Sequence, residues 1–289
     1  MVSRVYSNAT KERGAPAGPY GQPGYGQQSY QGYPQQGYGQ GYGSPEYGYA
    51  PSTPYQAAPV KRLTLDDVIM RTLTLLAIAV VTGAASWILV PRAPQIVIPL
   101  AVASSFVVLG IWIATFFVKR IGPGLAISYA LFEGVLLGVI SYFFETRWPG
   151  IVPQAILGTV GIFILMLVLH RTGVLRATPK FTRVVVGAAI GLCALMAVNF
   201  ITSFFFHLPL GIRDNGTGKP NWFAVGFSVV VIIVAALTFT VDFGAVEDGV
   251  RAGLDERYSW GFALAIVSSL IWLYFEILRF LSYLRRFAE

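Results

Sequence analysis

The chain has 289 residues, of which 55% are hydrophobic and only 12% are charged, and its formal net charge is +7. These values, with a mean hydropathy of +0.61, exclude an ordinary soluble domain, in which about a quarter of the residues are charged. The positive charge does not indicate a nucleic-acid partner, because the basic residues are scattered singly between apolar stretches, as they are in membrane proteins. The sequence therefore predicts an integral membrane protein that contacts the lipid bilayer.

Residues 1–60 are rich in Gly, Tyr, Gln and Pro, with repeats such as Tyr-Gly-Gln and Gly-Tyr-Gly. Because this segment has no aliphatic periodicity, it cannot bury enough apolar surface to offset the entropy lost on ordering. We expect a disordered tail, and its polar character argues against a cleavable signal peptide. The composition favours a solvated tether, and the regularly spaced tyrosines leave a self-associating segment open as the alternative.

Residues 61–289 are predicted to form one domain of seven transmembrane helices. The stretch Leu63-Thr64-Leu65-Asp66-Asp67 should begin the first helix, with Thr64 as its N-cap and Asp67 in its first turn. Seven apolar runs follow, each near the roughly twenty residues that a bilayer-spanning helix needs. These runs lie at about 72–90, 96–118, 124–144, 151–170, 182–206, 222–243 and 261–284.

Two of the runs contain glycines four residues apart. The pairs are Gly134 with Gly138 in the third run and Gly187 with Gly191 in the fifth. This spacing lets helices approach closely in lipid. We therefore expect both pairs to pack against neighbouring helices rather than to bind a ligand.

The distribution of lysine and arginine between the loops predicts a cytoplasmic N-terminus. With that orientation, most of the basic residues lie inside, and the outer loops carry only Arg92, Arg147, Arg213 and Lys219. Seven crossings then place Arg285 and Arg286 outside, against the rule. The side on which the C-terminus lies is therefore left open by the charges.

The last two apolar runs each contain one carboxylate. Asp242 lies near the end of the sixth run, and Glu276 lies among large apolar residues in the seventh. A charged carboxylate in hydrocarbon costs about 3 kcal/mol or more, so such residues usually face the bundle interior and are functional. The simpler alternative places Asp242 in the headgroup region and pairs Glu276 with Arg279, one turn away.

Two carboxylates that meet in a low-dielectric interior cannot both be charged at low cost, so a pair sharing one proton titrates in coupled steps. Loss of that proton creates repulsion that can separate two helices, which makes Asp242 and Glu276 a candidate pH-sensing pair. Their oxygens also suit Ca²⁺, so both are candidate metal ligands. A simple hairpin keeps them apart, because Glu276 lies about 24 Å along a helix that starts at Trp260. They meet only if residues up to about Ala265 lie outside the bilayer or if Asp242 lies deeper than its hydropathy suggests.

Three further polar residues are candidates for a cavity or an ion path, namely Glu133, Asn199 and Arg279. Glu133 lies in the middle of the third run, where lining a cavity and bonding to a neighbouring helix are equally consistent with its position. Asn199, in the fifth run, is better explained by a hydrogen bond between helices than by ligand binding.

Several stretches resemble the Bax inhibitor (transmembrane Bax-inhibitor-motif) family. Residues Ala130–Gly138 are similar to its A-L-x-E-G-x-x-L-G element, Asp242-Phe243 ends the sixth span as in that family, and Leu273–Leu278 resembles its L-Y-L-D stretch. Thr178–Thr182 resembles a loop of the actinobacterial branch, whose members also carry Tyr/Gly/Gln/Pro-rich tails. The resemblance covers about residues 63–286 and implies a member in a bacterial inner (plasma) membrane.

The resemblance implies a seven-helix bundle with the last helix central, and a calcium leak gated by two carboxylates that correspond here to Asp242 and Glu276. Glu276 departs from the family pattern, in which a shorter aspartate is usual, and the connection between the last two spans looks longer than usual. Some bacterial relatives instead bind and restrain a membrane-anchored ATP-dependent protease. A non-conducting regulator with such a protease partner is therefore the alternative function.

Motifs of the common enzyme classes are missing from the sequence, which has no G-x-S-x-G, no H-E-x-x-H and no Walker loop. An intramembrane aspartyl protease would need two aspartates in Y-D and G-x-G-D contexts, whereas this chain has V-D-F and F-E-I. Its only cysteine, Cys193, allows neither an intrachain disulfide nor a thiolate metal site. We expect no catalytic residue and no cofactor, apart from a transported or bound Ca²⁺ or other cation.

Overall fold

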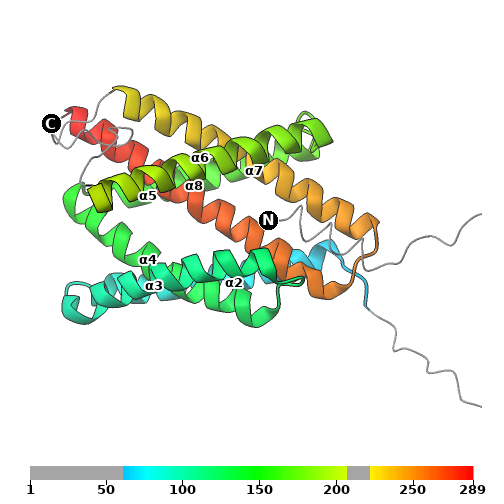
Figure 1. The fold of residues 1–289 in the computed structure, drawn as a ribbon, viewed down its shortest axis with the longest axis horizontal. Coiled ribbons are helices and arrows are strands. Elements are labelled where there is room, and N and C mark those ends of the chain that lie inside the picture. Colours follow the sequence, from blue (N-terminus) through cyan, green and yellow to red (C-terminus); the bar gives the residue numbers. More distant parts are fainter. Residues whose placement is uncertain (1–60, 207–221, 289) are drawn as a thin grey trace, which may run out of the picture.

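The computed structural model describes residues 61–206 and 222–288. Over these ranges the chain forms seven long helices that are apolar enough to cross a membrane, which confirms the predicted all-helical class and the seven spans (Figure 1). The predicted tail at residues 1–60 lies outside the described residues. The helices are α2 (Leu65–Leu89), α3 (Pro94–Phe117), α4 (Pro123–Arg147), α5 (Ile151–Arg171), α6 (Pro179–Phe206), α7 (Trp222–Arg251) and α8 (Ser259–Ala288), and the 3-10 turn η1 (Glu256–Tyr258) precedes α8.

Helix α2 begins where the sequence predicted. The hydroxyl oxygen of Thr64 accepts a hydrogen bond from the backbone N–H of Asp67 at 3.2 Å, and the Asp67 carboxylate accepts one from the backbone N–H of Thr64 at 3.1 Å. This capping box satisfies two backbone donors that an uncapped helix leaves unpaired. Local chemistry therefore determines where the first membrane helix starts.

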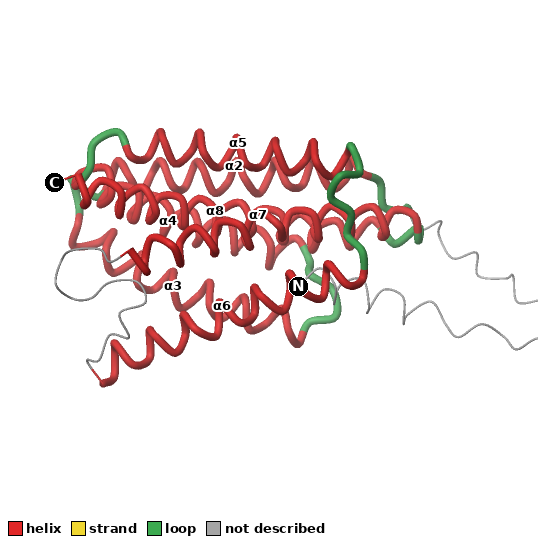
Figure 2. Tube along the Cα trace, turned by 90° about the horizontal axis from the view of Figure 1, so that it is seen from above, coloured by secondary structure: helices red, strands yellow, loops and turns green. Residues whose placement is uncertain are grey.

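Helix α8 is the central helix, as the family resemblance implied. In its most apolar stretch 78% of the residues are buried, against 6% in the corresponding stretch of α6. Figure 2 shows α8 running between α2 and α5 on one side and α3 and α6 on the other. Its side chains Phe262, Leu273 and Leu278 are completely buried. A charged residue on the inner faces of α8 is therefore surrounded by protein and not by lipid.

Helices α2 and α4 pack closely through small residues. A methyl group at Gly134 would overlap the backbone of Ala79, and one at Gly138 would overlap the backbone of Gly83. Both contacts confirm the close approach predicted for this glycine pair. They fix the position of α4 against α2.

The prediction for the second glycine pair was wrong. A methyl group at Gly187 or Gly191 would meet no described atom within 4 Å. The reason is that α6 lies at the edge of the bundle, where it packs chiefly against α7. Glycine spacing alone cannot distinguish a packed helix face from one that faces lipid.

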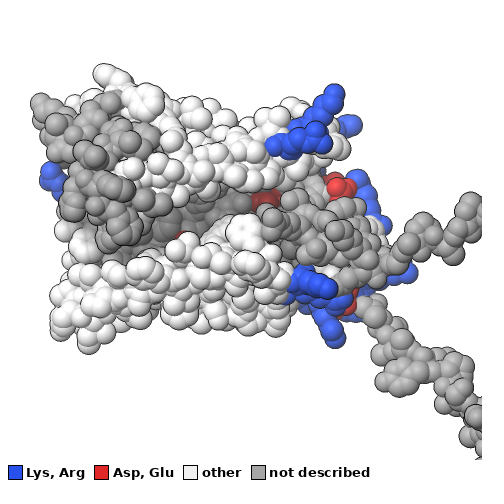
Figure 3. Space-filling model, viewed as in Figure 1, with Lys and Arg blue, Asp and Glu red and all other residues white. Residues whose placement is uncertain are grey.

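The basic residues gather at one end of the bundle. The start of the described chain and the α3–α4, α5–α6 and α7–α8 connections all lie at this end, as seven alternating helices require. Figure 3 shows the Lys and Arg side chains concentrated there, and we call it the basic end. Helix α8 finishes at the opposite end (Figure 1), so the described termini lie on opposite sides of the predicted membrane.

Candidate functional site

Asp242 lies deeper in the bundle than its hydropathy suggested. Helix α7 continues to Arg251, so Asp242 is nine residues, or about 13 Å, from the end of the helix. The predicted end of the sixth span at residue 243 was too early, because charged residues such as Glu247 mark the edge of the apolar region and not the end of the helix. Asp242 is only 7% exposed, so it is buried among the helices, while its depth in the membrane stays a prediction.

The carboxylate of Asp242 is bound by the central helix. The hydroxyl of Ser269 on α8 donates a hydrogen bond of 2.7 Å to Oδ2 of Asp242. Thr238, one turn earlier on α7, contacts the same hydroxyl at 3.4 Å. The three side chains join α7 to α8 through one polar contact inside an apolar interface.

At Glu276 the roles of the two helices are reversed relative to Asp242, because α8 carries the acid and α7 carries the hydroxyl. Ser228 on α7 donates a hydrogen bond of 2.7 Å to Oε1 of Glu276, which is 2% exposed. Arg279 Nη1 lies 3.5 Å from Oε2, so the predicted pairing of Glu276 with Arg279 is present as a long contact. Glu276 is thus held both by the neighbouring helix and by its own.

The structure holds the two carboxylates at different levels of the bundle. Ser269, which binds Asp242, lies seven residues before Glu276 on α8, and this spacing corresponds to about 10 Å along the helix axis. A proton shared directly between the two acids is therefore not the geometry of this structure, and one Ca²⁺ ion cannot contact both, because Ca–O distances are about 2.4 Å. We expected the carboxylates of Asp242 and Glu276 to contact each other, and the structure instead shows each one bound to a separate serine. A joint role of the two acids in gating stays a prediction.

Tyr274 fixes the rotation of α8 between these two contacts. Its hydroxyl lies 2.7 Å from the hydroxyl of Ser141 on α4, and both residues are buried. The contact connects α8 to α4, which is itself packed tightly on α2. Helix α8 is therefore held by α4 on one side and by the serine–carboxylate contacts with α7 on another.

The remaining candidate residues occupy separate places. Glu133, on α4, is 8% exposed, and its Oε2 atom is buried with no hydrogen-bond partner among the described residues. Asn199, on α6, has a buried Oδ1 atom without such a partner. No described contact joins either residue to Asp242 or Glu276. Whether they line an ion path stays a prediction, as does the hydrogen bond between helices expected for Asn199, because only its amide oxygen is unpaired, and only with respect to the described residues.

The described residues contain no group of three or more His, Cys, Asp or Glu side chains that could hold a metal ion. The site offers two buried carboxylates, each in contact with a hydroxyl donor across a helix interface. Such groups can exchange a proton, or bind a passing cation weakly together with water and backbone oxygens. Their chemistry suits transient contacts better than a permanent metal centre.

Sequence reasoning did not identify Ser228, Ser269 or Ser141. Serines are common in membrane helices, so their presence carries little information. A usable signal was the spacing of Ser269 and Glu276, because residues seven apart lie on the same face of a helix. This spacing indicates one polar stripe along α8, although it does not tell which helix the stripe faces.

The comparisons with known proteins agree with this architecture. A protein-family model described as Bax inhibitor 1 like matches residues 8–286. No curated protein matches the chain. The family match covers all seven spans, and it includes the carboxylates Asp242 and Glu276 and the serines that bind them, Ser269 and Ser228.

Proposed function

Because the chain belongs to the Bax inhibitor 1 like family, we propose that it is a pH-sensitive leak for Ca²⁺ or another cation. The observation that carries the proposal is the pair of reciprocal contacts between α7 and α8. Ser269 binds Asp242 and Ser228 binds Glu276, each at 2.7 Å and each in the buried part of the bundle. Carboxylates in such positions of a membrane protein commonly mark ion paths and proton relays.

The contacts hold α7 and α8 together differently in the two protonation states. A neutral acid bound to a serine hydroxyl fits an apolar interface at little cost. An ionised Asp242 needs further hydrogen-bond donors, a cation or water in addition to the Ser269 hydroxyl. Ionisation therefore favours entry of water or a cation between α7 and α8. We infer that this is how pH controls the leak.

A cation that enters this interface meets the two carboxylates in succession. Of these two acids Asp242 lies nearer the basic end, and Glu276 lies about 10 Å further along α8. Separate binding positions along a path allow an ion to enter and leave without being trapped.

The orientation follows from the basic end. Lysine and arginine are concentrated on the cytoplasmic side of membrane proteins, so we place the start of α2 and the α7–α8 connection in the cytoplasm of a bacterium. Asp242 is then the acid nearer the cytoplasm, and Glu276 is the acid nearer the outside.

The test is Ca²⁺ flux into liposomes that contain the purified protein, measured from pH 5 to pH 8. Asp242→Asn and Glu276→Gln should each remove part of the pH dependence, because each deletes one ionisable group while keeping its shape. Asp248→Asn is the matched control, since this acid lies on the same helix with its side chain 54% exposed. If both buried-acid variants keep the pH dependence of Ca²⁺ flux seen in the unchanged protein, the proposal is refuted. The non-conducting regulator is then the favoured function.

A further inference from the structure

At the basic end of the bundle, α5 is joined to α7 by a histidine and a glutamate that the proposed function does not use. Nε2 of His170 lies 3.2 Å from Oε1 of Glu247, and the His170 side chain is only 10% exposed. A carboxylate accepts hydrogen bonds and does not donate them, so Nε2 carries a hydrogen and donates it to Glu247. The other ring nitrogen, Nδ1, is buried without a hydrogen-bond partner among the described residues. Nδ1 is therefore the atom that takes up a further proton.

This polar contact ends a row of aromatic side chains between α5 and α7. Phe163 on α5 packs edge-on against Phe239 and Phe243 on α7, with ring centres 5.3 and 5.8 Å apart. Seven residues later on α5, the ring of His170 lies 5.5 Å from that of Phe243. On α7, Phe239, Phe243 and Glu247 follow at intervals of four residues, so they lie on one face of the helix. The face of α7 that meets α5 thus ends in a contact that can change its charge.

The contact lies beside the one that joins Asp242 to α8. Asp242 immediately precedes Phe243 in the chain and is bound by Ser269 of α8, whereas Phe243 meets the His170 ring of α5. Adjacent residues of a helix point to different sides, because each turn takes 3.6 residues. At this level, α7 is therefore held by α8 on one face and by α5 on another.

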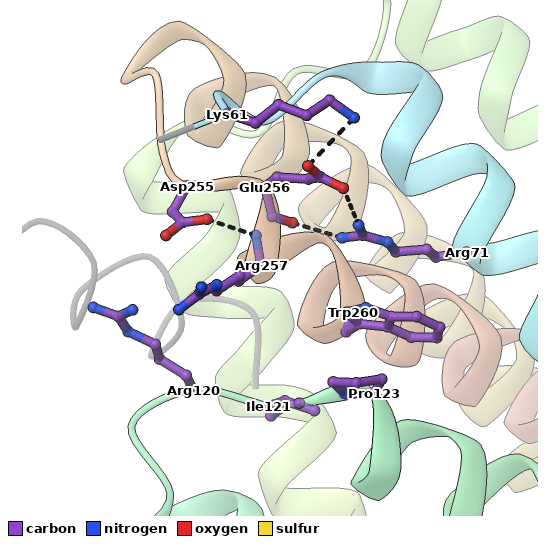
Figure 4. Close-up of a pocket in the computed structure, with 10 residues that line it drawn as sticks. Lys61, Arg71, Arg120, Ile121, Pro123, Asp255, Glu256, Arg257 and Trp260 are labelled. Carbon is purple, nitrogen blue, oxygen red and sulfur yellow. Dashed lines mark hydrogen bonds and ion pairs between the residues drawn. The ribbon is translucent and has the colours of Figure 1, made fainter. Parts of the chain in front are cut away.

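The neighbouring contacts leave α7 few ways to move. The connection after α7 is tied to the start of the described chain, because Glu256 lies between Lys61 and Arg71 and contacts both (Figure 4). Helix α5 packs on α8 as well as on α7, so it bridges the two acid-bearing helices. While α5 stays on α8, α7 cannot leave α8 without changing its contact with α5.

The charged groups around the pair are few. Arg251, one turn after Glu247, binds its other oxygen, Oε2, at 3.3 Å and lies 3.8 Å from Asp248. On the α5–α6 connection, Arg176 donates to the backbone carbonyl of Gly173. The part of α8 at this level, residues 259–275, has no charged residue, and α4 joins α5 at the opposite end of the bundle. The other charged residues of α5, α6 and α7 near this end make no described contact with the pair, and they are Arg171, Lys180, Arg183 and Asp242.

The strength of the contact depends on the charge of the imidazole ring. Histidine is the side chain that ordinarily changes its charge between pH 5 and pH 8. A charged ring donates a charge-assisted hydrogen bond, about twice as strong as a neutral one, and a buried cation that loses its carboxylate is left unpaired at high cost. We propose that His170 and Glu247 form a latch that holds α7 against α5 while the imidazole is protonated.

The effect of this latch on the leak rests on the proposed function. Rising pH removes the charge of His170, which weakens the hold of α5 on α7. Rising pH also ionises Asp242, which favours entry of water between α7 and α8. Both changes favour separation of α7 from α8, so the latch keeps the leak closed in acid and makes its opening with pH steeper.

The first experiment measures the latch without any flux. The full-length protein in mixed micelles carries His170→Gln, Glu247→Gln or both, and its unfolding is measured at pH 6 and pH 8. Glutamine keeps a hydrogen-bonding side chain and removes the charge. The coupling between the two substitutions, expressed as a ratio of unfolding constants, should be about threefold or more larger at pH 6 than at pH 8. Equal coupling at the two pH values would overturn the proposal.

The second experiment measures Ca²⁺ flux into liposomes with the same variants. His170→Gln and Glu247→Gln should each raise flux at pH 6 about threefold or more, because a charged latch cannot form, and should change it little at pH 8. Arg171→Gln is the matched control for the histidine, since this exposed neighbour makes no ion pair with Glu247. Asp248→Asn is the control for the glutamate, and both controls should behave like the unchanged protein.

The two experiments separate the latch from the leak. Unaltered flux at pH 6 in both latch variants, or an equal rise in the controls, would overturn the proposal. If the unchanged protein conducts no cation at any pH, the proposed function fails instead. The coupling measured by unfolding then still decides whether His170 and Glu247 form a pH-sensitive latch.

Discussion

The hydroxyl of Ser86 on α2 lies 3.2 Å from the backbone carbonyl oxygen of Val135 on α4 and donates a hydrogen bond to it. A side chain reaches a backbone atom of another helix only where the two helices are very close. The neighbouring glycine, Gly138, makes this approach possible, because any side chain there would overlap Gly83 and Ser86.

Replacing that glycine should destabilise the bundle. Gly138→Ala should lower the free energy of unfolding by about 1–3 kcal/mol, since the added methyl group forces the helices apart. Gly187→Ala is the control, because its methyl group meets no described atom within 4 Å. There the change should be neutral or slightly stabilising, by up to about 1 kcal/mol, through helix propensity. Equilibrium unfolding in mixed micelles measures both, and equal effects would contradict the close α2–α4 contact.

The serine that binds Asp242 should matter more than its neighbour in sequence. Ser269→Ala removes the hydroxyl that binds the carboxylate and should lower stability by about 1 kcal/mol, the usual range for such bonds between membrane helices. It should also displace the pH midpoint of cation flux. Ser268→Ala should have a smaller effect on both, because its hydroxyl binds only the backbone carbonyls of Leu264 and Ala265 in its own helix. A larger effect at position 268 would argue against the proposed role of Ser269.

The separation of the two acids predicts how their substitutions combine. Sites about 10 Å apart without shared partners usually have effects that add within about 0.5 kcal/mol. The double variant Asp242→Asn/Glu276→Gln should therefore show the sum of the single changes in unfolding free energy. A coupling energy above about 1 kcal/mol would mean that the two carboxylates meet in some state of the protein and share a proton there.

The orientation of the bundle can be tested with single cysteines in a Cys193→Ala background. Lys119→Cys and Arg176→Cys should react with a membrane-impermeant reagent only after the cells are opened, because both lie at the basic end. Arg147→Cys, at the far end of α4, should react in intact cells. The opposite pattern would reverse the orientation that we propose from the charges.

The sequence predicted the features that depend on local composition. The apolar runs located seven helices, Thr64 and Asp67 located the first helix start, and the spacing of Gly134 and Gly138 located a close helix contact. Each of these depends on residues near one another in the chain. The carboxylates Asp242 and Glu276 were also identified this way, because charge is rare in apolar runs.

The contacts made by those carboxylates could not be predicted, because they depend on the rotation and register of two helices. A shift of α8 by two residues would turn Ser269 away from Asp242, and nothing in the local sequence excludes such a shift. The pocket between the start of the described chain, the α3–α4 connection and the start of α8 was missed for a similar reason (Figure 4). Lys61, Arg120 and Arg257 lie on three separate segments, and only the fold brings them together.

The turn between the two acid-bearing helices is joined by backbone hydrogen bonds to the beginning of the domain. The N–H of Leu63 donates to the carbonyl oxygen of Leu254 at 2.7 Å, and the N–H of Glu256 donates to that of Lys61 at 2.9 Å. Helices α7 and α8 are therefore anchored near their connection and free of this constraint at their far ends. On the proposed mechanism, these backbone bonds restrict any separation of the two helices beside their connection, whereas separation at the far end has to break the stacking of Trp222 on Phe287.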